Sequence, residues 1–424
     1  MVSPTKKILL ATLLVNASRA LLAVVFMVSG FVKAVDPVGF MYKIKEYFAA
    51  FGFVDVPDFG MLCLALLFCG IEFIAGFFLL TGVYRRLVAL LSFLMLLVYT
   101  PLTLYVALEN PVPDCGCFGE AFRLTNWETF AKNMLLLLFA AVVCFRNNMY
   151  KRRVSCKNRW MVVLFAFAYL LLLEAVSVWH LPVIDFRPYA IGIDLREAVK
   201  DVPSVYEMRY VYEKGGEQQV FTSDALPDST WSYIGSRNEL VEKGRAATAK
   251  DFSFIDREAG DDVVDEILAD TGYVALVVME SLEKADESRV DKINDLYDYC
   301  KSGRVAFFAA TSSGDEAVAS WCRRTGAEYP LLWADDVMLK TVLRANPGLL
   351  LLKDGVVVGK WNINDVPEID SLSPAEQLVN ARSYIDIMRG WNFWLLLFAV
   401  PLAIILFMDM FAALPDKKKM KKNK

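Results

Sequence analysis

The stretch FGMLCLALLFCGIEFIAGFFLLTG, residues 59–82, decides the fold because it is long and apolar enough to cross a membrane. The hydrocarbon core of a bilayer is about 30 Å thick, and a helix needs about 20 residues to span it. Similar runs recur along the chain, and they predict six membrane spans: 14–35, 59–82, 86–107, 127–146, 160–180 and 391–411. The first run is too long for the core of a cleavable signal peptide, so we expect it to be retained.

Basic residues predict the orientation of these spans, because lysine and arginine concentrate in loops that stay in the cytoplasm. They gather in four segments: Lys6 and Lys7, Arg85 and Arg86, Arg146 to Arg159, and Lys417 to Lys424. Six spans place all four segments on one side. We therefore expect a multi-pass protein of the inner (cytoplasmic) membrane with both termini in the cytoplasm. The lysine-rich tail is also expected to contact anionic lipids.

The spans divide the chain into four predicted regions. Residues 1–150 are expected to form an antiparallel four-helix membrane domain. The loop at about 36–58 is expected to lie partly in the membrane interface. Residues 151–181 carry the fifth span, 182–388 an exterior, periplasmic domain, and 389–424 the sixth span and the basic tail. Between 185 and 388 there are 37 acidic and 22 basic residues, which argues against nucleic acid as a partner, since phosphate binding needs a basic surface.

The exterior region alternates between strand and helix patterns from about residue 270. Before that point a β-hairpin is expected over 205–222. The later pattern predicts an α/β sandwich of the thioredoxin-like type. Its expected elements are a strand at 273–279, a helix at 286–300, a strand at 305–310, a helix at 315–325, and a hairpin of 349–353 and 356–361. Asn346-Pro347-Gly348 falls where such domains carry a proline, often cis, before a strand.

The stretch Pro113-Asp114-Cys115-Gly116-Cys117-Phe118-Gly119 holds two cysteines one residue apart on the predicted outer side. Outside the reducing cytosol they can act as a redox pair or serve as a structural staple in a glycine-shaped loop. Cys63, near the outer end of the second span, is the candidate relay partner. A zinc site is less favoured, since it takes about four ligands and His180 is the sole histidine.

The exterior domain lacks the dithiol that its predicted fold would use. In a thioredoxin the redox motif follows the first core strand, and that place reads Glu280-Ser281-Leu282-Glu283-Lys284 here. Cys300 and Cys322 fall on separate predicted helices. We therefore expect this domain to bind a periplasmic thiol protein rather than to react with it.

Three ionisable residues lie in or beside the apolar runs: Arg19, Lys33 and Glu72. Charges in lipid are costly, and each is by default a hypothesis of function. Alternatively, Glu72 pairs with Arg19 or with a backbone group only to hold the bundle together. Lys33 is expected to extend to the outer interface.

Arg19, Ser29-Gly30 and Lys33 in the first span, with Glu72 and Gly76 in the second, resemble the DoxX-like membrane family. The Asp114-to-Gly119 loop and Asn126-Trp127 resemble its methylamine-utilisation branch, MauE. This resemblance covers about residues 14–147. It implies a four-helix membrane unit, a link to the maturation of disulfide-rich exported enzymes, and a membrane quinone as cofactor, with Glu72 and Arg19 as its candidate binding residues. Residues 346–355 resemble thioredoxin-like domains fused to DoxX-like proteins. Nothing in the sequence points to a methylamine dehydrogenase as the partner, so we do not extend that part of the resemblance to this chain.

Three functions stay open. The first is a thiol–disulfide oxidoreductase that passes electrons between Cys115 and Cys117 and a quinone. Asp114 would raise the pKa of the pair, which weakens this hypothesis. The second is a non-enzymatic scaffold with a redox-inactive docking domain. The third is a small-molecule carrier that uses Glu72 and Arg19, and it is the weakest because the spans lack broken helices.

Overall fold

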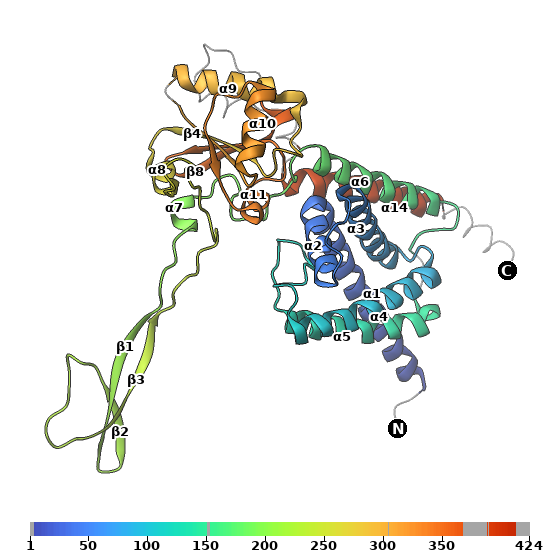
Figure 1. Cartoon of the computed structure of the whole chain (residues 1–424). Coiled ribbons are helices and arrows are strands. Elements are labelled where there is room, and N and C mark those ends of the chain that lie inside the picture. The colour runs from blue at the N-terminus through green and yellow to red at the C-terminus, as the bar shows by residue number, and fades with distance from the viewer. Residues whose placement is uncertain (1–3, 151–152, 304, 368–387, 389, 413–424) are drawn as a thin grey trace. The chain divides into compact units, whose positions relative to one another are not determined.

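The computed structural model describes residues 4–150, 153–303, 305–367, 388 and 390–412 (Figure 1). The lysine-rich tail and the last part of the predicted exterior domain, residues 368–387, lie outside the described residues. Two compact units share the chain. The membrane unit comprises Met1–Arg187, Leu343–Gly348 and Trp361–Lys424, and the sheet unit comprises Pro188–Val342 and Leu349–Lys360.

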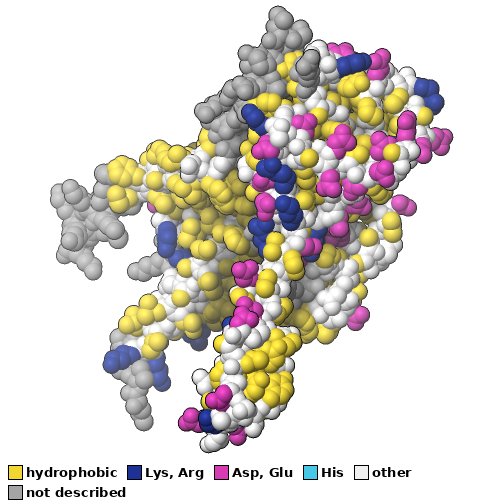
Figure 2. Space-filling view, turned by 90° about the vertical axis from the view of Figure 1, so that its left-hand side faces the viewer, with side chains coloured by type: hydrophobic (Ala, Val, Ile, Leu, Met, Phe, Trp, Pro, Cys, Tyr) yellow, Lys and Arg dark blue, Asp and Glu magenta, His cyan; other side chains and the backbone are white. Residues whose placement is uncertain are grey.

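Six helices of the described residues are long and apolar enough to cross a membrane, which confirms the predicted number. They are α1 (Pro4–Val35), α3 (Asp58–Thr81), α4 (Arg85–Glu109), α5 (Asn126–Phe145), α6 (Arg159–Trp179) and α14 (Trp391–Ala412). Helix α1 starts about ten residues earlier than the apolar run suggested, because no breaking residue interrupts residues 5–13. Hydrophobic side chains cover much of the surface of these helices (Figure 2), as expected for contact with lipid.

The first four spans form a closed arrangement in the membrane unit. Helix α1 packs against α3 and α5, and α4 packs against the same two helices. Helix α6 lies beside α1 and α3, and α14 lies beside α6. The approach of α1 to α3 depends on small residues: a Cβ atom on Gly76 would lie 2.6 Å from the backbone nitrogen of Met27. Glycine at such crossings is typical of helix packing in membranes.

The connection at 36–58, predicted as a loop partly in the interface, instead contains helix α2 (Pro37–Ala50). Its start follows the usual rules: the Asp36 side chain accepts a hydrogen bond from the Gly39 amide at 2.8 Å, and Pro37 occupies the first helical position. Met41 and Ile44 bury its apolar side against α3. The interpretation as a loop was wrong because Asp36-Pro37 was not recognised as a helix start.

The sheet unit contains a five-stranded sheet in the order β6-β5-β4-β7-β8. Its strands are β4 (Tyr273–Met279), β5 (Ala306–Thr311), β6 (Leu331–Trp333), β7 (Gly348–Lys353) and β8 (Val356–Asn362). Strands β4, β5 and β6 are parallel. The helices of this unit are α7 (Leu195–Ala198), α8 (Val264–Ala269), α9 (Val290–Gly303), α10 (Asp315–Thr325) and α11 (Asp336–Val342). The predicted strands, helices and hairpin from residue 273 onward are confirmed, and the Asn346-Pro347 bond is cis.

A second, three-stranded antiparallel sheet has the order β2-β1-β3. The predicted hairpin is present as β1 (Val205–Lys214) and β2 (Glu217–Phe221), and it turns at Gly215 and Gly216, both with positive φ. Strand β3 (Ser232–Glu242), which the sequence analysis did not predict, pairs along β1. We call this three-stranded sheet the β1–β3 arm. Exposed apolar side chains, among them Tyr206, Met208 and Tyr233, gather on it (Figure 2).

Candidate functional site

The loop that carries the cysteine pair connects α4 to α5, and hydrogen bonds hold its two ends together. Asn110 ends α4 in a left-handed conformation, and a capping box of Thr125 and Glu128 starts α5. The Asn126 side chain then donates hydrogen bonds to the Asn110 side chain at 3.1 Å and to the Val112 carbonyl at 3.3 Å. The loop is therefore a fixed element rather than a free connection.

The two thiols face each other inside this loop. The Sγ atoms of Cys115 and Cys117 are 2.6 Å apart, and no disulfide bond is assigned between them in the structure. Gly116 makes the turn between them, with φ of +63° and its amide donating to the Asp114 carboxylate at 2.9 Å. Cys115 is buried, whereas Cys117 is partly exposed. The predicted pair is therefore brought together, in two residues of unequal exposure.

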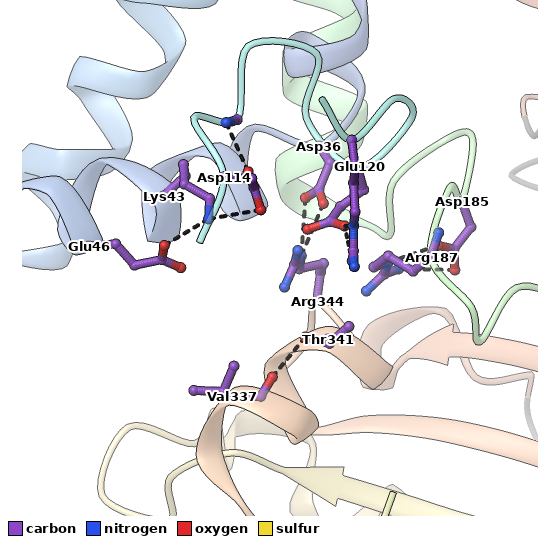
Figure 3. A network of polar contacts seen from close by, with 12 residues as sticks. Asp36, Lys43, Glu46, Asp114, Glu120, Asp185, Arg187, Val337, Thr341 and Arg344 are labelled. Atoms are coloured by element: carbon purple, nitrogen blue, oxygen red, sulfur yellow. Dashed lines mark hydrogen bonds and ion pairs between the residues drawn. The ribbon is translucent and has the colours of Figure 1, made fainter. Parts of the chain in front are cut away.

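Helices α1 and α2 hold the loop from the side. The Ser29 hydroxyl donates to the Cys117 carbonyl at 2.6 Å, and the Tyr47 hydroxyl donates to the Cys115 carbonyl at 3.2 Å. Figure 3 shows Lys43 between Glu46, at 2.7 Å, and Asp114, at 3.5 Å. A Cβ atom on Gly116 would lie 2.7 Å from Cγ of Lys43. The glycine is therefore required both for its φ angle and for the approach of this lysine.

The surroundings of the two thiols push their pKa values in opposite directions. The hydrogen bond from the Cys117 thiol lowers the pKa of Cys115 below the ordinary thiol value. Burial opposes this effect, while the Thr129 hydroxyl and the charge of Lys132 reinforce it. The same hydrogen bond, together with burial, raises the pKa of Cys117. Asp114 was expected to raise the pKa of the pair, whereas the pKa of Cys115 is lowered, chiefly by the hydrogen bond with Cys117.

A buried ion pair lies in the bundle within electrostatic reach of Cys117. Nζ of Lys33 on α1 is 2.6 Å from Oε2 of Glu72 on α3, and the two side chains are only 7% and 8% exposed. Arg19 or a backbone group was the alternative partner expected for Glu72, and the structure pairs Glu72 with Lys33 instead. Arg19 and Lys33 are separated by about 21 Å along α1, at 1.5 Å per residue, and Arg19 lies over the ring of Tyr150 instead. Lys33 also does not extend to the interface as expected, since Glu72 neutralises it inside.

The two cysteines of α3, Cys63 and Cys69, differ in their burial. Cys63 is exposed in the first turns of α3, and no hydrogen bond of the described residues joins it to Cys115 or Cys117. Cys69 lies fully buried about one turn before Glu72. It is close enough to Lys33, Glu72 and Glu174 to interact with their charges. The relay role of Cys63 stays a prediction that these contacts do not support.

A small pocket borders the loop. Its lining includes Asp36, Phe40, Lys43, Gly116 and Gly119, and its volume is about 30 Å³, enough for about one water molecule. At its edge, Nε of Arg344 lies 3.0 Å from the Asp36 carboxylate, which also caps α2 (Figure 3). Arg187, another lining residue, pairs with Asp185 at 2.8 Å. Charged groups of both signs therefore surround the approach to the cysteine loop.

The remaining candidates lie apart from the pair. Cys300 is buried on α9, where burial raises the pKa of its thiol to about 12, and Cys322 lies on α10. His180 is bonded to Asp365, with Nδ1 2.7 Å from the carboxylate. Within the described ranges, no three His, Cys, Asp or Glu residues converge to hold a metal ion.

The sequence analysis missed Thr129 and Lys132, the α5 residues that act on Cys115. A signal was present, because Thr125 and Glu128 have the spacing of a capping box and fix where α5 starts. Positions 129 and 132 then fall three residues apart on one helix face, directly after the loop.

Two family models match parts of the chain. Residues 10–146 match the family model described as methylamine utilisation protein MauE. Residues 206–243, which contain most of the β1–β3 arm, match a model described only as a domain of unknown function, DUF8463. No curated protein and no solved structure matches the chain. The chain is therefore a multi-pass membrane protein whose first third is similar to the MauE family.

Proposed function

We propose that this protein is a membrane thiol–disulfide oxidoreductase, and that Cys115 and Cys117 oxidise a dithiol in a protein on the outer side of the membrane. The observation that carries the proposal is the contact of the two sulfurs at 2.6 Å with opposite pKa shifts. Such asymmetry separates the sulfur that leaves as a thiolate from the sulfur that is attacked.

The exchange starts with the pair as a disulfide. A partner thiolate attacks Sγ of Cys117, which belongs to the more exposed residue of the pair, and the Cys115 sulfur leaves with the electron pair of the S–S bond. A sulfur with a lowered pKa is the better leaving group. The partner's second thiolate then attacks the partner sulfur of the mixed disulfide, and Cys117 leaves and takes up a proton. Two electrons pass from the partner to the pair, and the partner gains a disulfide.

A membrane quinone is the class of acceptor that would reoxidise the pair. The buried Lys33 ammonium near Cys117 is a suitable hydrogen-bond donor for a quinone oxygen. The pocket beside the loop, at about 30 Å³, has room for one water rather than a quinone ring. This pocket is therefore too small to hold the quinone.

In this proposal the sheet unit docks the partner protein. We treat β4, β5, β7 and β8 as a thioredoxin-like arrangement that lacks the dithiol after β4. The position after β4 holds a hydrogen-bonded turn, in which Ser281 and Ser313 both donate to the Glu283 carboxylate, at 2.8 and 2.6 Å. Cys300 is inert in this view, because its raised pKa keeps it a thiol.

Trapping of mixed disulfides in cells tests the proposal. Cys115→Ser leaves Cys117 as the remaining loop thiol. In the reverse direction of the exchange its thiolate attacks the disulfide of an oxidised partner and releases one partner thiolate, and Cys115 is not there to resolve the mixed disulfide. We expect reductant-sensitive complexes on a non-reducing gel with Cys115→Ser and few with Cys117→Ser. Cys144→Ser, which removes a thiol at the other end of α5, is the matched control and should behave like the wild type. Equal complexes in the Cys115→Ser/Cys117→Ser double variant would contradict the proposal.

A scaffold without redox activity is the second candidate, and the β1–β3 arm favours it. Tyr206, Met208, Val220 and Ile234 are exposed on this small sheet, and apolar surface of this kind marks interaction sites. Partner complexes that persist in the double cysteine variant and resist reductant would support the scaffold instead.

A further inference from the structure

Arg19 is a buried cation with two nitrogen atoms that make no hydrogen bond. The residue is 5% exposed, and its Nε and Nη1 atoms make no hydrogen bond to the described residues. Its guanidinium lies over the Tyr150 ring, 4.7 Å from the centroid. A cation–π contact of this kind contributes about 2 kcal/mol, whereas an uncompensated buried charge costs several kcal/mol. The contact with Tyr150 alone therefore does not account for a charged side chain at this position.

The neighbouring groups add positive charge rather than neutralise it. Nη1 of Arg85 donates to the Tyr150 carbonyl at 3.1 Å, and Arg153 is near enough to repel Arg19. Among the ion pairs of the described residues, none joins Arg19, Arg85 or Arg153 to a carboxylate. Arg19 and Arg85 thus contact Tyr150, Arg153 lies within electrostatic reach of Arg19, and a bound anion would balance these three positive charges.

An apolar groove starts one helical turn from Arg19. It lies between α1 and α5 with a volume of about 310 Å³, and it is lined by Ala11, Leu14, Val15, Ala141, Val142, Phe145 and Arg146. Val15 precedes Arg19 by four residues, or about 6 Å along the helix. Apart from Arg146, the lining is purely hydrocarbon, which suits an acyl chain and not a soluble anion.

We propose that a phosphate group binds at Arg19, Arg85 and Arg153, and that it belongs to an anionic phospholipid whose acyl chain occupies the groove between α1 and α5. Guanidinium groups bind phosphate through paired N–H···O hydrogen bonds, and the unpartnered Nε and Nη1 atoms are available for them. This site is independent of the cysteine pair and of the proposed redox function.

Thermal unfolding of the purified full-length protein in neutral detergent separates the sources of the phosphate. Dioctanoyl phosphatidylglycerol is expected to raise the unfolding midpoint by several degrees in a saturable way. Dioctanoylglycerol, which lacks the phosphate, and inorganic phosphate, which lacks the chains, should each give much smaller shifts. An equal shift with inorganic phosphate would overturn the lipid assignment, and an equal shift with dioctanoylglycerol would overturn the phosphate site.

Variants assign the effect to residues. Arg19→Met removes the charge and keeps most of the volume, so it should abolish the shift with phosphatidylglycerol. Without lipid it should unfold no earlier than the wild type, because it no longer buries an unpaired charge. A residue with only a structural role would show the opposite, a lower midpoint whatever the lipid. Arg86→Gln, the removal of an exposed arginine at the start of α4, is the matched control and should keep the full shift.

A second variant keeps the test valid if Arg19→Met does not fold. Ala141→Phe fills the groove and leaves the arginines in place. It should reduce the shift with phosphatidylglycerol and leave the small effect of inorganic phosphate unchanged. An unaltered lipid shift in Ala141→Phe, or an equal loss in Arg86→Gln, would refute the site.

Discussion

The two cysteines of the α4–α5 loop have different surroundings although only Gly116 separates them. Cys115 is buried and receives stabilisation of its thiolate from Cys117, Thr129 and Lys132. Cys117 is partly exposed, and its carbonyl is held by Ser29. At the scale of single residues, this asymmetry is the basis for assigning attack to one sulfur and departure to the other.

The pH dependence of alkylation tests this asymmetry. In the reduced protein, the rate of alkylation of Cys115 should rise with pH around a midpoint below that of an ordinary thiol, about 8.5, because its folded-state pKa is lowered. Cys117→Ala removes the hydrogen-bond donor to the thiolate, and Thr129→Val removes a hydroxyl group that lowers the pKa of Cys115, so both should move the midpoint upward. Thr100→Val is the control, since that hydroxyl donates to the Leu96 carbonyl. A midpoint that neither loop variant moves would contradict the assignment.

The Lys33–Glu72 pair yields a prediction about stability. Glu72→Gln leaves the Lys33 ammonium buried without a carboxylate, which should destabilise the protein by about 3–5 kcal/mol. Replacing both partners, as Lys33→Met with Glu72→Leu, should restore much of that loss because no charge is left unpaired. Denaturant unfolding in detergent compares the variants. A double variant that is as unstable as Glu72→Gln would argue against a partnership of these two groups.

Some of the site could be predicted from the sequence at this scale, and some could not. Two cysteines one residue apart, with a glycine between them, must lie close together in any fold. The partner of Glu72 depends on how α1 and α3 are aligned along their lengths, and both Arg19 and Lys33 were available on α1. Apolar periodicity does not specify that alignment, so the ion pair was assigned to the wrong residue.

At the scale of elements, long apolar runs were predictable and short elements were not. The spans agree with the runs because a helix in lipid must satisfy its own backbone hydrogen bonds over its whole length. Helix α2 and strand β3 were missed for different reasons. The first is short and amphipathic, and the second has exposed side chains in nearly every position, so its pairing with β1 leaves no apolar alternation in the sequence.

At the α1–α3 crossing, we expect a glycine-to-alanine substitution to destabilise the protein, which is the reverse of its usual effect in a helix. Alanine in place of glycine in a helix normally stabilises it by about 0.5–1 kcal/mol. Gly60→Ala on α3 should follow this rule, because nothing lies within 4 Å of the added Cβ. Gly76→Ala should instead destabilise by about 1–3 kcal/mol, since its Cβ would lie 2.6 Å from the Met27 nitrogen and 2.8 Å from the Ala23 carbonyl oxygen. The free energy of unfolding of both variants, measured in detergent, tests this prediction. If Gly76→Ala were more stable than the wild type, α1 and α3 could move apart without cost.

At the scale of the whole molecule, the number of spans and the four basic segments together determine the expected orientation. We expect both ends of the chain in the cytoplasm and the β1–β3 arm outside. Reporter fusions at Asn148 and Lys424 should both score cytoplasmic, and a fusion at Gly215 should score exterior. An exterior score at Lys424 would require an odd number of crossings and would move the sheet unit, or the cysteine loop, to the other side.

The most direct test of the central claim is the redox state of Cys115 and Cys117 in intact membranes. Cells are quenched with acid, treated with N-ethylmaleimide, and the peptide that ends at Arg123 is analysed by mass spectrometry with and without prior reduction. Our account predicts an unmodified, disulfide-linked peptide before reduction and a doubly modified peptide after it. A peptide that is already doubly modified without reductant, in cells whose phenotype is unchanged by Cys115→Ser with Cys117→Ser, would contradict the redox function.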